Sequence, residues 1–203
     1  MKGEAGLAVS YLRHIGREEL YVGVPAGAVS RVHLPDDEAR KRFVTAVLKA
    51  KCEPGEQLEL LGEPVAELST ERRAGLRRQV AALSPIVGLI TSLNVWENLS
   101  LPAAYHGAPP LERVAATAEE VLARFGVEAR PFLARLPDEL GALERKLAAF
   151  IRLLVSGPAL ALVDALQAGL SRSERAAVPI FEEQLRTRLP GATLLYVDSK
   201  EKD

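Results

Sequence analysis

The sequence predicts an α/β protein, and three observations carry that prediction. Short apolar segments of β type alternate with longer segments whose apolar residues recur at helical spacing. Helical patterns dominate the middle of the chain, and a buried strand, residues 159–163, follows them. A chain of 203 residues with 48% hydrophobic content can bury one sizeable core. We therefore expect a single domain, residues 1–203, with a core from residues 1–83 and 156–203 and a helical lobe at residues 84–155.

The expected strands are apolar or alternating segments bounded by turn residues such as Pro25-Ala26-Gly27 and Pro54-Gly55. They lie at residues 7–12, 19–24, 29–34, 57–61, 79–83, 159–163 and 193–197. The expected helices lie at residues 37–51, 70–78, 95–101, 111–125, 140–155 and 173–189. The strongest helical pattern is at residues 140–155, where a wide apolar stripe predicts a buried face. Its members are Leu140, Leu143, Leu147, Phe150, Ile151 and Leu154.

Composition argues against several classes of function. The net charge is −1 and the pI about 6.4, so the basic helix at residues 70–78 indicates a solvated face, and we expect no nucleic-acid partner. A single cysteine, Cys52, fits a reducing compartment. The three histidines, His14, His33 and His106, lack metal-ligand spacing, so we expect no metal site. We also expect no signal peptide and no membrane-spanning helix.

Residues 34–48 have the outline of a phosphate-binding loop and helix but not its chemistry. Such a loop uses glycines so that bare backbone N–H groups surround an anion at the helix N-terminus. No glycine lies between Gly27 and Gly55. Three carboxylates occupy the loop, and one lysine remains where a phosphate-binding lysine would lie. These residues are Asp36, Asp37, Glu38 and Lys41. The segment predicts a nucleotide-binding scaffold that has lost its nucleotide chemistry.

Seven fragments, taken in order, resemble motifs of the ATP-binding cassette of ABC transporters over nearly the whole chain. Residues 136–145, Leu-Pro-Asp-Glu-Leu-Gly-Ala-Leu-Glu-Arg, resemble the signature segment, and residues 160–164, Leu-Ala-Leu-Val-Asp, resemble the Walker B strand. The other fragments are residues 24–27, 35–43, 54–62, 89–102 and 168–171. The resemblance implies a P-loop NTPase-like (RecA-like) core with an inserted helical lobe.

The chain departs from this family at positions that the resemblance assigns to chemistry. Only Lys41 and Asp164 match its polar nucleotide-binding groups, and we interpret them as vestigial. The altered positions are Asp36, Asp37 and Glu38 in the phosphate loop, Arg42 for the Mg²⁺-binding Ser or Thr, Ser84 for the Q-loop glutamine, Gly141, Ala142 and Leu143 in the signature, Ala165 for the catalytic carboxylate, Ser171 for the D-loop aspartate and Asp198 for the switch histidine. With Ala165 there is no general base at that position, so we expect no catalytic residue and no cofactor.

Simpler interpretations exist for the residues that match. Lys41 lies at helical spacing from Asp37 and beside Glu38, so it can be an ordinary solvated lysine with an acidic partner. Asp164 at a strand end can be a structural cap or turn former. Trp96 can pack inside the helical lobe, or it can contact a partner, because the family meets its permease near this segment.

The resemblance implies a degenerate cassette subunit with a structural or regulatory role on the cytoplasmic face of a membrane transporter. Its expected partners are a permease and either an intact ATPase subunit, in a hetero-oligomer, or a second copy in a homodimer. Residues 95–107 resemble cassettes of Mla/MCE-type lipid transporters. The expected permease contacts are Leu89, Ile90, Leu93, Trp96 and Glu97. Two alternatives stay open: a slow or partner-completed ATPase that uses Mg·ATP with Lys41 and Asp164, and a free-standing regulatory interaction protein.

Overall fold

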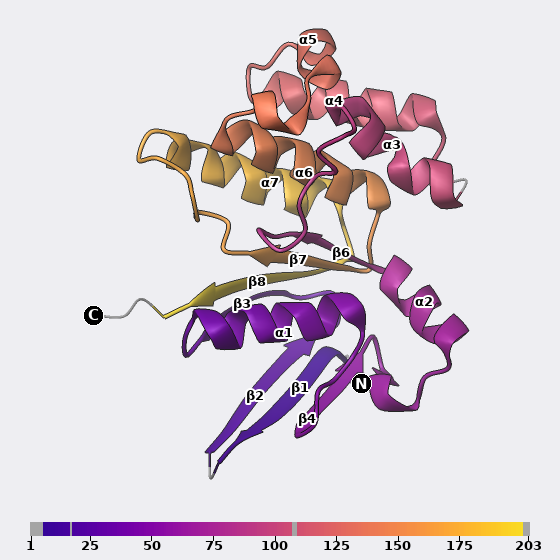
Figure 1. Ribbon diagram of the computed structural model, residues 1–203, viewed down its shortest axis with the longest axis vertical. Helices are drawn as coiled ribbons and strands as arrows, with labels where there is room; N and C mark the ends of the chain where they lie inside the picture. Colours follow the sequence, from indigo (N-terminus) through magenta and orange to yellow (C-terminus); the bar gives the residue numbers. More distant parts are fainter. Residues whose placement is uncertain (1–5, 17, 107–108, 201–203) are drawn as a thin grey trace, which may run out of the picture. The chain divides into compact units, whose positions relative to one another are not determined.

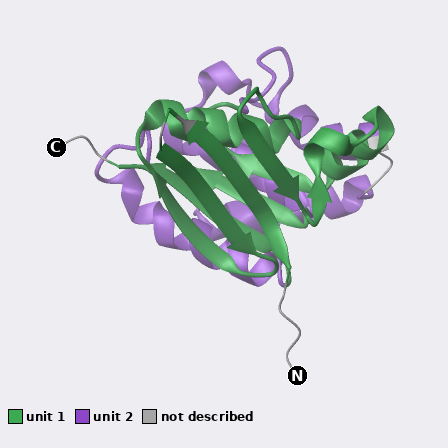
Figure 2. Cartoon of the chain, turned by 90° about the horizontal axis from the view of Figure 1, so that it is seen from below, with its two compact units in different colours: residues 1–86, 158–165, 191–203 green, residues 87–157, 166–190 purple. Residues whose placement is uncertain are grey.

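The computed structural model describes residues 6–16, 18–106 and 109–200 (Figure 1). By their contacts the residues divide into two compact units (Figure 2). Unit 1 comprises residues 1–86, 158–165 and 191–203, and unit 2 comprises residues 87–157 and 166–190. The expected α/β fold is confirmed, and the structure shows that one of its sheets is parallel.

The described residues of unit 1 form two four-stranded sheets. One is antiparallel, in the order β2-β1-β4-β5, and the other is parallel, in the order β3-β8-β7-β6. The antiparallel strands are β1 (Leu7–Ile15), β2 (Glu18–Pro25), β4 (Glu56–Leu60) and β5 (Glu63–Pro64), and the parallel strands are β3 (Val29–Leu34), β6 (Val80–Leu83), β7 (Leu160–Asp164) and β8 (Thr193–Ser199). The helices are α1 (Asp37–Lys49), the 3-10 turn η1 (Val65–Glu67) and α2 (Thr70–Arg78).

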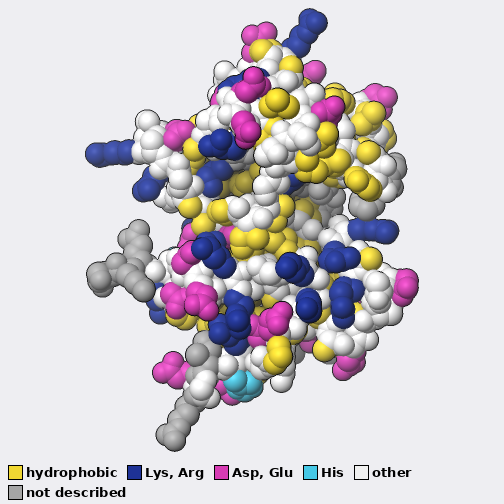
Figure 3. All heavy atoms as spheres, viewed as in Figure 1, with side chains coloured by type: hydrophobic (Ala, Val, Ile, Leu, Met, Phe, Trp, Pro, Cys, Tyr) yellow, Lys and Arg dark blue, Asp and Glu magenta, His cyan; other side chains and the backbone are white. Residues whose placement is uncertain are grey.

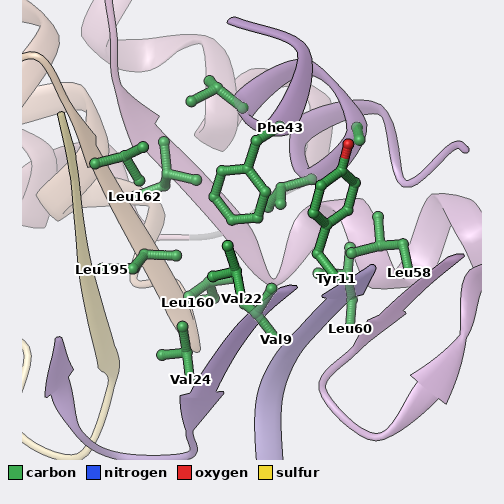
Figure 4. Packing of buried hydrophobic residues seen from close by; sticks show 14 of the residues in the cluster. Val9, Tyr11, Val22, Val24, Phe43, Leu58, Leu60, Leu160, Leu162 and Leu195 are labelled. Atoms are coloured by element: carbon green, nitrogen blue, oxygen red, sulfur yellow. The ribbon is translucent and has the colours of Figure 1, made fainter. Parts of the chain in front are cut away.

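The core of unit 1 forms where α1 packs between the two sheets (Figure 4). Phe43 of α1 is fully buried and meets Tyr11 of β1 edge to face, with ring centroids 5.2 Å apart. Leu162 and Leu195 of the parallel sheet belong to the same cluster. The apolar face expected for α1, from Phe43 to Leu48, therefore packs against side chains of both sheets.

Unit 2 is helical. Helix α6 buries Leu147, Phe150 and Ile151 in this unit. Phe150 contacts Phe181 of α7 with ring centroids 4.9 Å apart, and Phe125 contacts the same ring at 4.7 Å. The elements are α3 (Val95–His106), α4 (Leu111–Arg124), α5 (Ala129–Ala134), η2 (Pro137–Glu139), α6 (Ala142–Ser156), η3 (Glu174–Ala177) and α7 (Val178–Arg188). Within the described ranges, no helix combines the length and the apolar character needed to cross a membrane.

The helical unit differs from the expected lobe. Residues 166–190, which we assigned to the core, group by contacts with residues 87–157. The aromatic packing of Phe181 on Phe150 is one physical reason. The helix expected at residues 173–189 is divided into η3 and α7, and α5 was not predicted because six residues give too short a periodic pattern.

Candidate functional site

The connection from β3 to α1 is a short turn rather than an open loop. β3 ends at Leu34 and α1 begins at Asp37, so only Pro35 and Asp36 lie between them. Asp36 caps the helix, because its carboxylate accepts the backbone N–H of Ala39 at 2.8 Å. In a phosphate-binding loop, several residues between the strand and the lysine stay out of the helix and surround the anion. Here α1 has already begun four residues before Lys41.

Arg40 is the residue that organises this region, and the sequence analysis did not single it out. Its side chain is 6% exposed, and its guanidinium bonds Oδ1 of Asp164, the fully buried residue at the end of β7. Ser84, which follows β6, donates its hydroxyl to Oδ2 of Asp164 at 2.5 Å. Both carboxylate oxygens of Asp164 are therefore bonded to other side chains of unit 1. Asp164 is neither a helix cap nor a turn former but the acceptor of a buried ion pair.

Asp37 joins Arg40 and Lys41 on the first turns of α1. It accepts Nε of Arg40 at 2.9 Å and Nζ of Lys41 at 2.7 Å. Hydrogen bonds from Lys41 and then Arg40 lower the pKa of Asp37. Burial works to lower the pKa of Arg40, but its hydrogen bonds to Asp37 and Asp164 outweigh burial and raise it. The interpretation of Lys41 as a solvated lysine paired with Asp37 is confirmed, since its side chain is 60% exposed.

Lys41, Glu38 and Arg42 line a surface hollow of about 410 Å³, together with Thr45, Ala46, Lys49, Lys51, Glu53 and Glu56. Neither Arg40 nor Asp164 is among its lining residues. The two residues that matched the family's nucleotide-binding groups, Lys41 and Asp164, therefore have separate surroundings. Arg42 lies 3.6 Å from Glu56, and on the face that carries α1 basic side chains lie beside acidic ones (Figure 3). The hollow is therefore lined by charges of both signs and does not present a uniformly positive surface to an anion.

Two further altered positions lie at the ends of β7 and β8. Ala165 has a left-handed backbone with φ of 46°, and its N–H bonds the carbonyl of Val197. Asp198 lies opposite His33 in the β3–β8 register and forms an ion pair with Arg31 at 3.4 Å. Ala165 carries no acid or base, and the carboxylate of Asp198 is engaged by a cation.

The signature-like segment forms a tightly bonded helix start. Gly141 is the N-cap of α6, and its N–H bonds Oε2 of Glu144 at 2.7 Å. Arg135 bonds both carboxylate oxygens of Glu144, at 2.5 and 3.1 Å. The hydrogen bond from Arg135 lowers the pKa of Glu144. The sequence predicted that this helix begins at residue 140, but α6 begins at Ala142. The reason is that Gly141 has the extended backbone of an N-cap.

Glu174 is a second residue that the sequence analysis missed. Its carboxylate accepts the backbone N–H of Leu143 at 3.3 Å through Oε1 and that of Ser171 at 2.8 Å through Oε2. The hydroxyl oxygen of Ser171 in turn accepts the backbone N–H of Glu174 at 3.3 Å. The spacing Ser171-Arg172-Ser173-Glu174 is that of a capping box, so the sequence did contain a signal for this pair.

The segment expected to contact a permease is held in place by Asn98, a fully buried amide on α3. Its Oδ1 accepts the N–H of Ile90 at 2.7 Å. Its Nδ2 donates to the carbonyls of Ile90, Leu93 and Asn94 at 3.0 to 3.1 Å. The expected contact residues lie here: Ile90 is 45% exposed, Leu89, Leu93 and Trp96 are half-buried, and Glu97 bonds the N–H of Asn94. Nothing in the periodicity pointed to Asn98.

Within the described ranges, no three His, Cys, Asp or Glu side chains gather as metal ligands. The chemistry of the region is therefore that of ion pairs and backbone caps. Arg40, Asp37, Ser84 and Asp164 form one bonded group in unit 1, while Glu174, Ser171, Leu143, Glu144 and Arg135 hold the start of α6 in unit 2.

Two curated relatives are similar in sequence, while no family model matches the chain. The chain is 30% identical over 128 residues to the pyoverdine export ATP-binding/permease protein PvdT of Pseudomonas putida, a match that covers 63% of this chain and 19% of PvdT. It is 30% identical over 109 residues to the lipoprotein-releasing system ATP-binding protein LolD of Chromohalobacter salexigens, covering 53% of this chain and 45% of LolD. The chain thus aligns with less than half the length of either relative.

Solved structures give the fold. CbiO1 of Clostridium perfringens, part of the ABC transporter complex CbiONQ, matches with a TM-score of 0.72 and 14% identity over 96% of this chain and 79% of CbiO1. The ATP-binding cassette MJ0796, in a dimer bound to ADP and Pi, matches with a TM-score of 0.71 and 19% identity over 95% and 86%. The fold is therefore that of a P-loop NTPase. More narrowly, it is the fold of an ABC transporter cassette, and the resemblance seen in the motifs is confirmed.

Proposed function

We propose that this chain is a nucleotide-independent cassette subunit of a membrane ABC transporter, with a structural or regulatory role. One observation carries the proposal: Arg40 occupies both the carboxylate of Asp164 and that of Asp37. In P-loop NTPases, the aspartate of the Walker B strand and the Ser or Thr after the loop lysine hold the Mg²⁺ of the nucleotide. Here the first is paired with a guanidinium, and the second is Arg42.

These residues do not fit Mg·ATP. Magnesium would have to displace a buried arginine from Asp164, which leaves a desolvated guanidinium without one of its partners. The triphosphate would meet Asp36, Asp37 and Glu38 at the amino end of α1, where like charges repel. At this helix start the backbone N–H of Ala39 already bonds the Asp36 carboxylate, and that of Arg40 bonds the Asp36 carbonyl. No catalytic step through nucleotide is therefore assigned to this chain.

Sequence similarity supports a place beside a permease. LolD is named as the ATP-binding protein of a lipoprotein-releasing system, and PvdT as an export ATP-binding/permease protein. By analogy with these relatives, we propose that this chain acts in a transporter, on the cytoplasmic face of the membrane. Lipid or lipidated cargo is the candidate substrate class. MJ0796 is described as a dimer, which supports pairing of this chain with an intact ATPase subunit or with a second copy.

The contact to the permease is assigned to residues 89–97. Ile90 is an exposed aliphatic side chain, and Asn98 fixes the backbone that carries it. A rigid backbone reduces the entropy lost on binding, and one aromatic with a few aliphatic anchors can supply most of the binding energy. Trp96 and Leu89 are the half-buried neighbours that can provide these anchors.

Affinity purification of the tagged chain from membranes of its native host tests the proposal. Wild type is expected to bring down a permease, and Trp96→Ala or Leu89→Asp should reduce that recovery at least about tenfold, which corresponds to about 1.4 kcal/mol. Lys41→Ala is the control, because Lys41 makes only an exposed ion pair. Recovery without any permease would favour the free-standing regulatory protein. ATP turnover by the purified chain, lost with Lys41→Ala, would favour the slow ATPase.

A further inference from the structure

The amino end of α6 carries an anion supplied by the chain itself. Leu143, in the first turn of α6, donates its backbone N–H to Oε1 of Glu174 at 3.3 Å. Oε2 of the same carboxylate accepts the N–H of Ser171 at 2.8 Å. Hydrogen bonds from Ser171 lower the pKa of Glu174, so the group is a carboxylate at neutral pH. The positive end of the helix dipole therefore has a negative charge bonded to it.

The N–H of Gly141, the N-cap of α6, is also engaged. The N–H of Gly141 bonds Glu144, and Arg135 holds Glu144 in that position through two bonds. An anion arriving at this helix start from outside would have to displace the Glu174 carboxylate or approach it against charge repulsion. The side chains of Ala142 and Leu143 add no hydroxyl or other donor.

We infer that Glu174 is a positioning residue that closes the start of α6 to outside anions, so that this chain does not complete the nucleotide site of a partner cassette. The inference rests on the proposed function. The resemblance implies that the signature segment, here residues 136–145, binds the γ-phosphate of ATP held by the opposite subunit. Arg40 engages Asp164 next to α1, and Glu174 engages the start of α6. Such a chain neither binds nucleotide itself nor contacts the nucleotide bound by its partner.

This identifies the kind of partner that the chain fits. Hydrolysis in an assembly would come from sites formed by other subunits. This chain would contribute its permease-contact segment, residues 89–97, and not a half of an ATP site.

Phosphate titration followed by ¹⁵N NMR of the full chain tests the inference, with inorganic phosphate as the probe. In wild type, the amide signal of Leu143 should not move as phosphate is added. In Glu174→Ala, the Leu143 signal should start from a different position, because its acceptor is gone, and should then move with phosphate in a saturable way. Glu174→Gln, which keeps an acceptor oxygen but no charge, is the second variant if Glu174→Ala does not fold. Glu119→Ala is the matched control, since Glu119 is an exposed carboxylate of the same unit, and should behave as wild type.

A saturable phosphate response of Leu143 in wild type would overturn the inference. So would a folded Glu174→Ala variant whose Leu143 signal is unchanged from wild type. A second titration of wild type with Mg·ATP separates this result from the proposed function: signals of Ala39 and Lys41 that move with Mg·ATP would contradict nucleotide independence, whatever Leu143 does with phosphate.

Discussion

Among single residues, Arg40 is the most important for this site, because its guanidinium links two carboxylates that lie far apart in the sequence. Asp37 is three residues from Arg40, whereas Asp164 is 124 residues away. The first contact was foreseeable from helical spacing, and the second was not, since only the pairing of the parallel strands brings the end of β7 to the start of α1.

Removing Arg40 should destabilise the protein strongly. Arg40→Ala leaves Asp164 buried without its cation, which costs about 3–5 kcal/mol. Urea unfolding monitored by circular dichroism measures this. Lys41→Ala, the matched control on the same helix, should change the free energy of unfolding by no more than about 0.5 kcal/mol, because its ion pair is exposed.

Adding Asp164→Asn to Arg40→Ala should recover part of that loss, since the stranded charge is then neutral. A loss below about 1 kcal/mol for Arg40→Ala alone would show that the pair does not hold the site together.

At the scale of elements, the helix starts carry the specific polar chemistry of the fold. Helix α1 is capped by Asp36, α6 by Gly141 with Glu144, and the turn that opens η3 by Ser171 with Glu174. The sequence predicted β3 and α2 with the bounds that the structure has, because each is bounded by clear turn or cap residues. It did not predict Asn98, since a buried amide that bonds a loop leaves no periodic signal.

Asn98→Ala should loosen the segment that precedes α3. The substitution removes the partner of the Ile90 N–H and of the Leu93 carbonyl, at a cost of about 1–3 kcal/mol, while the carbonyls of Ile90 and Asn94 keep bonds from the backbone N–H groups of Leu93 and Asn98. Hydrogen exchange should then speed up at residues 90–94. Exchange in α4 should be unchanged. Unaltered exchange at Ile90 would contradict the role given to Asn98.

The Arg135–Glu144 pair should make stability depend on pH in the acid range. The folded pKa of Glu144 lies below its unfolded value of about 4.3, so its contribution is present above that pH and is lost as the pH falls through the folded pKa. Melting temperatures between pH 6 and 3 should therefore fall less steeply for Glu144→Gln than for wild type. Glu119→Gln should follow wild type, and equal slopes for all three proteins would count against the pair.

At the scale of the whole molecule, the fold could be predicted from the sequence, but the side chains that engage the family's nucleotide-binding positions could not. Order and spacing of the motifs gave the cassette fold, which the solved structures confirm. The sequence also showed that the loop glycines and the carboxylate at position 165 are missing. What replaces them depends on tertiary contacts: a buried arginine at Asp164 and a glutamate at the start of α6. Residues that match the family's motifs, such as Lys41, therefore gave less information than the residues around them.

Restoring one catalytic group should not restore catalysis. Ala165→Glu supplies a carboxylate after β7, but the short β3–α1 turn and the Arg40–Asp164 pair remain. A phosphate-release assay should give no turnover above the buffer rate for wild type or for this variant. Turnover by Ala165→Glu would mean that nucleotide still reaches the site.

Binding of Mg·ATP to the isolated chain is the measurement that addresses the central claim most directly. Thermal unfolding with and without millimolar Mg·ATP, together with isothermal titration calorimetry, should show no change in melting temperature and no saturable heat. A ligand present at about 100 times its Kd would stabilise the folded state by about 2.7 kcal/mol, which such a scan detects readily. A rise of that size, abolished by Lys41→Ala, would contradict nucleotide independence and identify the chain as a working cassette.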